Sequence, residues 1–326
     1  YKKIHNNNII INTHNDFLTQ VMNYGYVLDT DLTGKTHSDL TSIKKGALDV
    51  QFFSVWSDGA QKNPYAYANR QIDSLDAVIK RNPDKIVKVA NVAAILKAVN
   101  EHKIAALIGL EGGHQIENSL ENLDALYQRG TRYITLTWNN STAWATSAFD
   151  EKFNPEYKGK GLSPFGKEVV LHMNKIGMLV DVSHVGETTF WDVTATTTKP
   201  IIASHSSVYN LCPHQRNLKD DQIKAIAKNG GVIQVNFNSG FIDPSEGKKE
   251  DAFIAKHQTE MDSIIQSGQN MYVAEEMIHK KYYEESQSLR APFSMLINHI
   301  QYIIKLVGVD YVGIGSDFDG IILPPQ

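Results

Sequence analysis

Short runs of apolar residues alternate with longer amphipathic stretches along most of the chain. Apolar positions three or four residues apart are typical of helices packed on one face, and we predict helices over 86–101, 118–129, 163–176, 218–229 and 292–307. The apolar runs between these stretches are rich in β-branched residues, as buried strands are. Eight of them are predicted strands: 8–13, 47–56, 104–111, 132–138, 178–184, 200–205, 231–237 and 311–317.

Strands and helices in alternation indicate repeated βα units around a parallel sheet. Eight such units in one chain predict a single α/β domain over residues 1–326, a (β/α)8 TIM barrel. The segment 243–290 breaks this rhythm, because it is polar, charged, helix-prone and far longer than an ordinary βα loop. We expect a helical insertion above the barrel mouth, which is either a solvated excursion or a lid over substrate.

Composition narrows the possible partners and the possible chemistry. The 326 residues include 32 basic and 36 acidic side chains, for a net charge of -4, without the runs of like charge that nucleic-acid surfaces carry. We therefore expect a small substrate and no nucleic acid. Cys212 is the single cysteine, so the chain forms no intrachain disulfide, and any metal must be held by His, Asp and Glu.

The sequence carries little information on location. No apolar run approaches the roughly 18 to 20 residues of a membrane span, so we expect no transmembrane segment. The chain opens with Tyr1 rather than Met, which suggests that a start segment has been removed. We expect an exported protein, periplasmic or associated with the cell surface, with the cytoplasm as the alternative.

Polar side chains gather at the predicted strand ends, where the active sites of such barrels lie. His14 and Asp16 stand two positions apart on an extended chain and point to the same side, so they can share a metal ion, bind a substrate or bind each other. A single histidine such as His184 or His205 can equally be a structural residue. Five of the eight strand ends nevertheless carry a histidine or a carboxylate: His14 and Asp16, Glu111, Asp181 with His184, His205, and Asp317.

Glu111 closes an apolar run, and a carboxylate buried there without a cation would cost several kcal/mol. Three imidazoles and two carboxylates suit Zn²⁺ or a similar divalent ion. Five ligands are too many for one tetrahedral zinc that keeps a position open, whereas two metals that share a bridging carboxylate use all five. Such a pair holds a hydroxide at neutral pH and stabilises the oxyanion formed when it attacks a carbonyl.

Six blocks of sequence, in order from residue 12 to residue 320, resemble the membrane dipeptidase (renal dipeptidase) family of amidohydrolase-like zinc metallopeptidases. The resemblance implies a binuclear zinc dipeptidase on a (β/α)8 barrel, with substrates that include dipeptides ending in a D-residue. The blocks are THND (13–16), GLEGGH (109–114), GLSPFG (161–166), DVSH (181–184), ASHSSVYNLCPHQRN (203–217) and GVDYVGIGSDFDG (308–320).

The resemblance also implies a role for each residue of the metal site. His14 and Asp16 are then the terminal ligands of one zinc, His184 and His205 those of the other, and Glu111 bridges both.

Two further residues take roles from the resemblance. Asp317 matches the acid that takes a proton from the attacking water and passes it to the leaving amine. Arg216 matches the residue that pairs with the C-terminal carboxylate of the substrate, for which a guanidinium fork is suited. Without its flanking block, Arg216 would be interpreted as a surface arginine in a loop before a helix.

The chain departs from the family pattern at three places. Trp138 stands where the well-known mammalian members have a histidine that contacts the substrate carbonyl, so stabilisation of the oxyanion must come from the metals, from Trp138 or from Asn139. Asn12 replaces an aspartate found in many relatives. The sequence ends at Gln326, before the helices with which members usually continue, so we expect either a truncated chain or a partner subunit, as in a homodimer, that covers the gap.

Two other functions remain open on the sequence. A different binuclear amidohydrolase, acting on N-acyl amino acids or lactams, would keep the metals and give Arg216 another role. A metal-binding or peptide-binding protein without catalysis is the third possibility, suggested by Trp138 and the early end of the sequence. Turnover of dipeptides that a chelator abolishes and zinc restores would separate the three.

Overall fold

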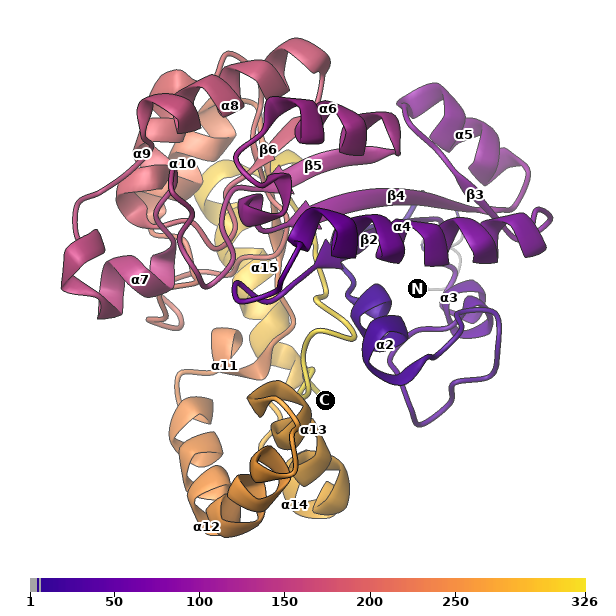
Figure 1. Cartoon of the computed structure of the whole chain (residues 1–326), viewed down its shortest axis with the longest axis vertical. Coiled ribbons are helices and arrows are strands. Elements are labelled where there is room, and N and C mark those ends of the chain that lie inside the picture. Colours follow the sequence, from indigo (N-terminus) through magenta and orange to yellow (C-terminus); the bar gives the residue numbers. More distant parts are fainter. Residues whose placement is uncertain (1–4, 6) are drawn as a thin grey trace.

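The chain folds around a closed ring of parallel strands (Figure 1). The structure is a computed structural model that describes residue 5 and residues 7–326, and within them eight strands form the ring. Each overlaps one predicted strand, which confirms the (β/α)8 barrel. In order around the ring they are β1 (Ile11–Asn12), β2 (Val50–Trp56), β4 (Ile104–Glu111), β5 (Thr131–Thr135), β6 (Leu179–Asp181), β7 (Ile202–Ala203), β8 (Val232–Val235) and β9 (Val312–Ile314).

A ninth strand, β3 (Ile86–Lys88), lies outside this ring and was missed by the sequence pattern, which assigned 86–101 to one helix. The helix α5 runs from Val92 to Asn100. It begins only at Val92 because the Asn91 side chain caps its N-terminus by accepting a hydrogen bond from the Ala94 amide. β3 pairs with the first residues of β4, ahead of the point where β5 joins β4. It therefore covers an edge that the ring leaves open.

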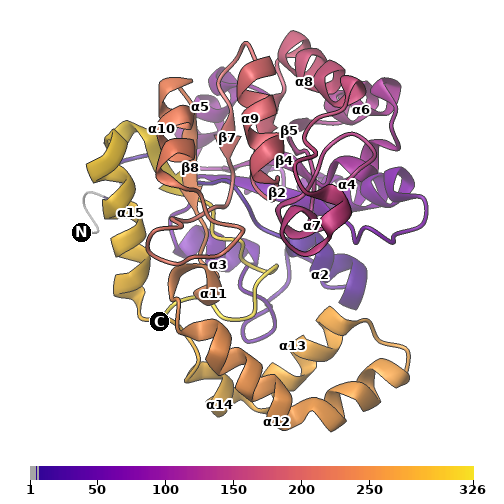
Figure 2. The same cartoon turned by 90° about the vertical axis from the view of Figure 1, so that its left-hand side faces the viewer.

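Helices pack around the outside of the ring (Figure 2). The predicted helices at 118–129, 163–176, 218–229 and 292–307 are confirmed to within two residues at each end. None of the described helices is both long and apolar enough to span a membrane. The surrounding helices are α2 (Phe17–Tyr24), α3 (Leu40–Lys45), α4 (Pro64–Arg81), α5, α6 (Leu120–Gln128), α7 (Ala148–Phe153), α8 (Pro164–Ile176), α9 (Glu187–Thr196), α10 (Asp220–Lys228) and α15 (Phe293–Val307).

The predicted insertion is helical, as expected, and follows β8 on the carboxyl-terminal side of the barrel. Figures 1 and 2 show the helices of residues 246–287 at one end of the molecule. A small apolar core of its own joins these helices to the chain after β9, with Phe253, Ile278 and Leu323 all buried in it. The helices of the insertion are α12 (Glu246–Gln266), α13 (Met271–Lys281) and α14 (Tyr283–Gln287), and the short helix α11 (Ser239–Ile242) precedes it.

Inside the barrel, one glycine makes room for a tyrosine that reaches the catalytic end. Tyr133 on β5 is fully buried, and a Cβ atom at Gly109 on the neighbouring β4 would overlap its ring. The Tyr133 hydroxyl lies 2.8 Å from His14 Nδ1 and donates to the Thr13 carbonyl oxygen at 3.0 Å. Gly109 on β4 therefore makes room for the tyrosine that orients His14, just after β1.

Replacing this glycine tests that packing. We expect Gly109→Ala to lower the free energy of unfolding by about 1 to 3 kcal/mol, since overpacking a close-packed core costs that much. Gly247→Ala is the matched control, because no atom lies within 4 Å of the added methyl group and the residue is helical. Denaturant unfolding of both variants gives the comparison. An unchanged midpoint for Gly109→Ala would show that the Tyr133 ring moves aside without cost.

Candidate metal centre and active site

The predicted metal ligands meet at the carboxyl-terminal rim of the barrel. His14, Asp16, Glu111, His184 and His205 are all buried, and Asp317 lies beside them. They come from chain segments up to about three hundred residues apart and are brought together by the closure of the ring. Their places are after β1 (His14, Asp16), at the last residue of β4 (Glu111), and after β6 (His184), β7 (His205) and β9 (Asp317).

Glu111 lies at the centre of this group. Its Oε2 atom is 3.0 Å from His14 Nε2, and its Oε1 atom is 2.9 Å from His184 Nε2 and 3.6 Å from His205 Nε2. Ser54 on β2 donates a hydrogen bond to Oε2 at 3.1 Å. The two carboxylate oxygens thus face two different sets of imidazoles, which is the arrangement a bridging ligand requires.

The aspartates complete one side of the group. Asp16 Oδ2 lies 3.3 Å from His14 Nε2, while Asp16 Oδ1 is buried and has no hydrogen-bond partner among the described residues. Asp317 Oδ1 is 3.9 Å from His14 Nε2, and Asn236 Nδ2 donates to Asp317 Oδ2 at 2.8 Å. A buried carboxylate oxygen without a donor is destabilising unless a cation occupies the space in front of it.

The donor atoms at the rim fall into three overlapping triads, each with its donor atoms within 4.8 Å of one another. Glu111 belongs to two of them, and Asp317 belongs to the third. The triads are His14, Asp16 and Glu111; Glu111, His184 and His205; and His14, His205 and Asp317. Imidazole and carboxylate donors at this spacing fit a divalent metal ion of the zinc type. The unpartnered Asp16 oxygen agrees with that fit, so the residues present can hold metal at this rim.

A second layer of contacts orients the imidazoles. Ser204 Oγ lies 2.7 Å from His205 Nδ1 and donates to Asp181 Oδ2 at 2.5 Å. Asn139 Oδ1 lies 3.2 Å from His184 Nδ1, and the Tyr133 hydroxyl engages Nδ1 of His14. Each ring therefore has its Nδ1 atom occupied and turns Nε2 toward Glu111, as metal-binding histidines do.

Two of the imidazoles are held neutral, which is the form that binds metal. Burial, together with the positive charge of Arg216, lowers the pKa of His184 to about 3. Burial also lowers the pKa of His205 well below its usual value, with the charge of His14 as the next cause. The Nε2 lone pairs of both rings are therefore available at neutral pH.

Two of the site residues adopt backbone conformations that side chains rarely take. His184 and Asp317 have φ angles of 63° and 62°, in the left-handed region. The Asp317 amide donates to the His14 carbonyl oxygen at 3.2 Å, which ties the end of β9 to the end of β1. Strain of this kind persists where the surrounding structure imposes it, and it is concentrated at functional sites.

Arg216 is a buried guanidinium without an acidic partner. It is 6% exposed, and its Nε and Nη1 atoms are buried with no hydrogen-bond acceptor among the described residues. Nη2 donates only a long bond of 3.4 Å to the His205 carbonyl oxygen. Burial lowers the pKa of Arg216 to about 10, so it remains charged at neutral pH. It is not the surface arginine of the alternative interpretation, and its free donors favour an anionic ligand.

Trp138 and Asn139 lie on the barrel wall next to His184. The Trp138 ring is 6.4 Å from the His184 ring and packs edge-on against Trp56, at 4.9 Å between centroids. Tyr272, from α13 of the insertion, contacts both indoles, at 5.7 Å from Trp138 and 6.3 Å from Trp56. The insertion therefore reaches the rim through one aromatic side chain.

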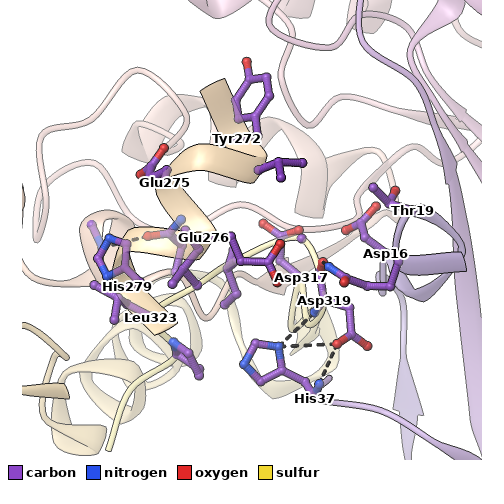
Figure 3. Close-up of a pocket in the computed structure, with 18 of the residues that line it drawn as sticks. Asp16, Thr19, His37, Tyr272, Glu275, Glu276, His279, Asp317, Asp319 and Leu323 are labelled. Atoms are coloured by element: carbon purple, nitrogen blue, oxygen red, sulfur yellow. Dashed lines mark hydrogen bonds and ion pairs between the residues drawn. The ribbon is translucent and has the colours of Figure 1, made fainter. Parts of the chain in front are cut away.

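One cavity of ≈ 1470 Å³ connects these features. Its lining includes Asp16, Glu111, Arg216, Trp138 and Asp317 from the barrel, and Tyr272 with other side chains from the insertion. Figure 3 shows Asp16 and Asp317 on one side of the cavity and Tyr272 on α13 on the other. The cavity can hold a molecule considerably larger than two amino acids.

The sequence interpretation missed Tyr133 and Tyr272 at this site, and it placed Asp181 at a strand end without giving it a role. Tyr133 orients His14, Asp181 accepts four hydrogen bonds that fix the ends of β6 and β7, and Tyr272 joins the insertion to the rim. A tyrosine in an apolar strand and an aspartate at a strand end were visible signals for the first two. Nothing in the sequence marked Tyr272, because its partners Trp56 and Trp138 lie far from it in the sequence.

Comparison with known proteins agrees with this geometry. Residues 1–326 match the family model described as membrane dipeptidase (peptidase family M19). An uncharacterized dipeptidase of Schizosaccharomyces pombe is 33% identical over 345 residues, covering 100% of this chain and 72% of that protein.

Solved structures show the same fold at lower identity. The probable dipeptidase PvdM from Pseudomonas aeruginosa is 23% identical, with a TM-score of 0.77 over 98% of this chain and 85% of its own. A metallopeptidase from Rhodobacter sphaeroides, liganded with a phosphinate mimic of the dipeptide L-Ala-D-Ala, is 20% identical, with a TM-score of 0.77 over 97% of this chain and 87% of its own.

Proposed function

The chain belongs to the membrane dipeptidase family and is a metallodipeptidase, and we propose that it hydrolyses dipeptides with two Zn²⁺ ions held at the barrel rim. His14 and Asp16 would hold one ion, His184 and His205 the other, and Glu111 both. When bound, such a pair supplies a hydroxide at neutral pH and polarises the peptide carbonyl. The three imidazoles favour zinc over magnesium or calcium.

The observation that carries the proposal is the place of Arg216. A buried guanidinium with two unfilled donors lines the same cavity as the metal cluster. Its planar fork matches a carboxylate, so a substrate whose C-terminal carboxylate pairs with Arg216 would present its peptide bond to the rim. A free carboxylate one residue beyond the scissile bond defines a dipeptide rather than a longer chain.

Asp317 is positioned to move the proton. Asn236 holds its Oδ2 atom, while Oδ1 faces His14 and the cluster. In our proposal Asp317 accepts a proton from the attacking water and returns it to the leaving amine. Trp138 and Asn139 form the wall beside His184, where they would position the substrate. Because Asn139 Oδ1 engages His184 Nδ1, its direct effect is to orient that ring.

A D-residue at the C-terminal position is part of the proposal. The ligand named for the Rhodobacter sphaeroides neighbour mimics L-Ala-D-Ala, which supports acceptance of that configuration here. The size of the cavity agrees, since it imposes no narrow fit on the C-terminal side chain.

A substrate panel tests the proposed function. We expect the full chain, stripped of metal by a chelator and reloaded with Zn²⁺, to hydrolyse L-Ala-L-Ala and L-Ala-D-Ala but neither trialanine nor N-acetylalanine. Release of free alanine is the measurement, and the stripped protein is the blank. Turnover of N-acetylalanine without turnover of any dipeptide would replace the dipeptidase proposal with an N-acyl amino acid hydrolase.

The bridging role of Glu111 predicts a loss of both metals together. Glu111→Ala should reduce bound zinc from two ions per chain to nearly none, measured by elemental analysis after dialysis. Asp317→Asn is the matched control, because it should keep both ions while kcat falls by roughly 10²- to 10⁴-fold through loss of the proton carrier. One zinc ion retained at wild-type affinity in Glu111→Ala would contradict the shared ligand.

Carboxylate recognition by Arg216 predicts a selective effect on KM. Arg216→Ala should raise KM for L-Ala-L-Ala by roughly 10- to 100-fold, the value of a charged hydrogen bond, and change KM for the C-terminal amide far less. Arg81→Ala is the control, since Arg81 is exposed and pairs with Asp29 at 3.0 Å. Equal increases for the free and the blocked dipeptide would remove Arg216 from this role.

A further inference from the structure

A second group of ionisable side chains lies between α12 and α13 of the insertion. Glu246 and Glu250 are one turn apart on α12, and Glu275 and His279 are one turn apart on α13. Residues four apart lie on the same face of a helix, so each helix presents a pair. All four side chains line the cavity, and Figure 3 shows Glu275 and His279 among them.

Three of these side chains come close enough to share one ion. Donor atoms of Glu250, Glu275 and His279 lie within 4.8 Å of one another, near the roughly 4 Å between ligand atoms on opposite sides of one metal ion. His279 Nε2 is 2.7 Å from Glu250 Oε1, and the Ser286 hydroxyl lies 2.7 Å from Nδ1 of the same ring. The imidazole is therefore oriented by an outer contact, as at the barrel rim.

Apart from the contact of Glu250 Oε1 with His279, the carboxylate oxygens of this group lack partners among the described residues. Glu250 Oε2 is buried with no hydrogen bond among the described residues. Glu246 is only 5% exposed, and neither it nor Glu275 has a side-chain hydrogen bond or ion pair within the described part of the chain. Gly240 leaves room for the Glu246 side chain, because a Cβ atom at this glycine would lie 2.7 Å from Glu246 Oε2. Several unpaired carboxylate oxygens facing one space indicate that a cation belongs there.

The nearby lysines are engaged elsewhere. Lys249 lies 3.6 Å from Asp243, and Lys280 lies 2.6 Å from Glu276. No lysine or arginine of the described residues forms an ion pair with Glu246, Glu250 or Glu275, so no fixed positive charge of the protein compensates these carboxylates.

We propose that Glu246, Glu250, Glu275 and His279 bind a third divalent cation of the Zn²⁺ or Mn²⁺ type, separate from the rim cluster. Carboxylates with one imidazole suit these ions better than Ca²⁺ or Mg²⁺, which prefer oxygen alone. Acidic and histidine side chains from two facing helices are also the way in which helical bundles build metal sites.

This ion would act on the insertion rather than on the reaction. Its ligands come in pairs from α12 and α13, so binding would fasten the two helices to each other. α13 begins at Met271 and carries Tyr272, the residue that contacts Trp56 and Trp138 at the rim. The cation therefore sets the position of the cavity wall opposite the catalytic centre.

Metal counting on full-length variants tests the proposal. After stripping and dialysis against micromolar Zn²⁺, we expect one more ion per chain in the wild type than in Glu246→Gln/Glu275→Gln, with the rim ions and the turnover of L-Ala-L-Ala retained in the variant. Neither substituted side chain has a described hydrogen bond to lose. Glu276→Gln is the matched control: it lies on the same helix and lines the same cavity, but it pairs with Lys280 and Tyr24.

Hydrogen exchange locates the ion independently of the count. Zn²⁺ should slow amide exchange in 246–281 of the wild type and of Glu276→Gln, but not in Glu246→Gln/Glu275→Gln. Equal metal content in the wild type and the double variant would overturn the proposal. A raised KM for lysine-containing dipeptides alone, with metal content unchanged, would overturn it too and make the group a subsite for a cationic substrate side chain. The loss of both rim ions from Glu111→Ala tests the proposed function, and its outcome does not depend on the third ion.

Discussion

The structure depends on the burial of one carboxylate at the end of an apolar strand. Glu111 terminates β4, whose residues are all buried, and it has no lysine or arginine within ion-pair distance among the described residues. Such a charge is tolerated only where cations or charged donors surround it. The barrel brings histidines from the ends of β1, β6 and β7 to the two oxygens. Because His184 and His205 are neutral, metal ions shared by these oxygens would supply the positive charge that the carboxylate requires.

This constraint explains how much the sequence could predict. Strands are apolar runs, and polar residues at their carboxyl ends must face the same rim once a barrel is assumed, so His14, Asp16, Glu111, His184 and His205 could be assigned without coordinates. Strand β3 could not be predicted, because Ile86 and Val87 fit a helix as well as a strand. The left-handed backbone conformation of His184 also could not be predicted, since it is imposed by contacts with segments distant in the sequence.

In the insertion, too, the sequence predicted the elements but not the contacts between them. Its polarity and length predicted helices, but not the pairing of α12 with α13 that places Glu250 against His279. Four-residue spacings of acidic residues are common on solvated helices, so Glu246 with Glu250 carried no signal alone. Burial of Glu246 and of the Glu250 Oε2 atom, neither with a described partner, is what distinguishes them from surface charge. The same test, applied to Arg216, separates a ligand-binding guanidinium from an ordinary loop arginine.

The family resemblance predicts a histidine where this chain has Trp138. The difference changes which chemical groups are available at this part of the rim. An indole can donate one hydrogen bond but cannot accept a proton or bind metal. In the structure its ring lies against those of Trp56 and Tyr272, so the position contributes aromatic surface to the wall of the cavity. In our proposal, stabilisation of the oxyanion would then come from the bound metal ions, and the contact made by Tyr272 joins this wall to the insertion.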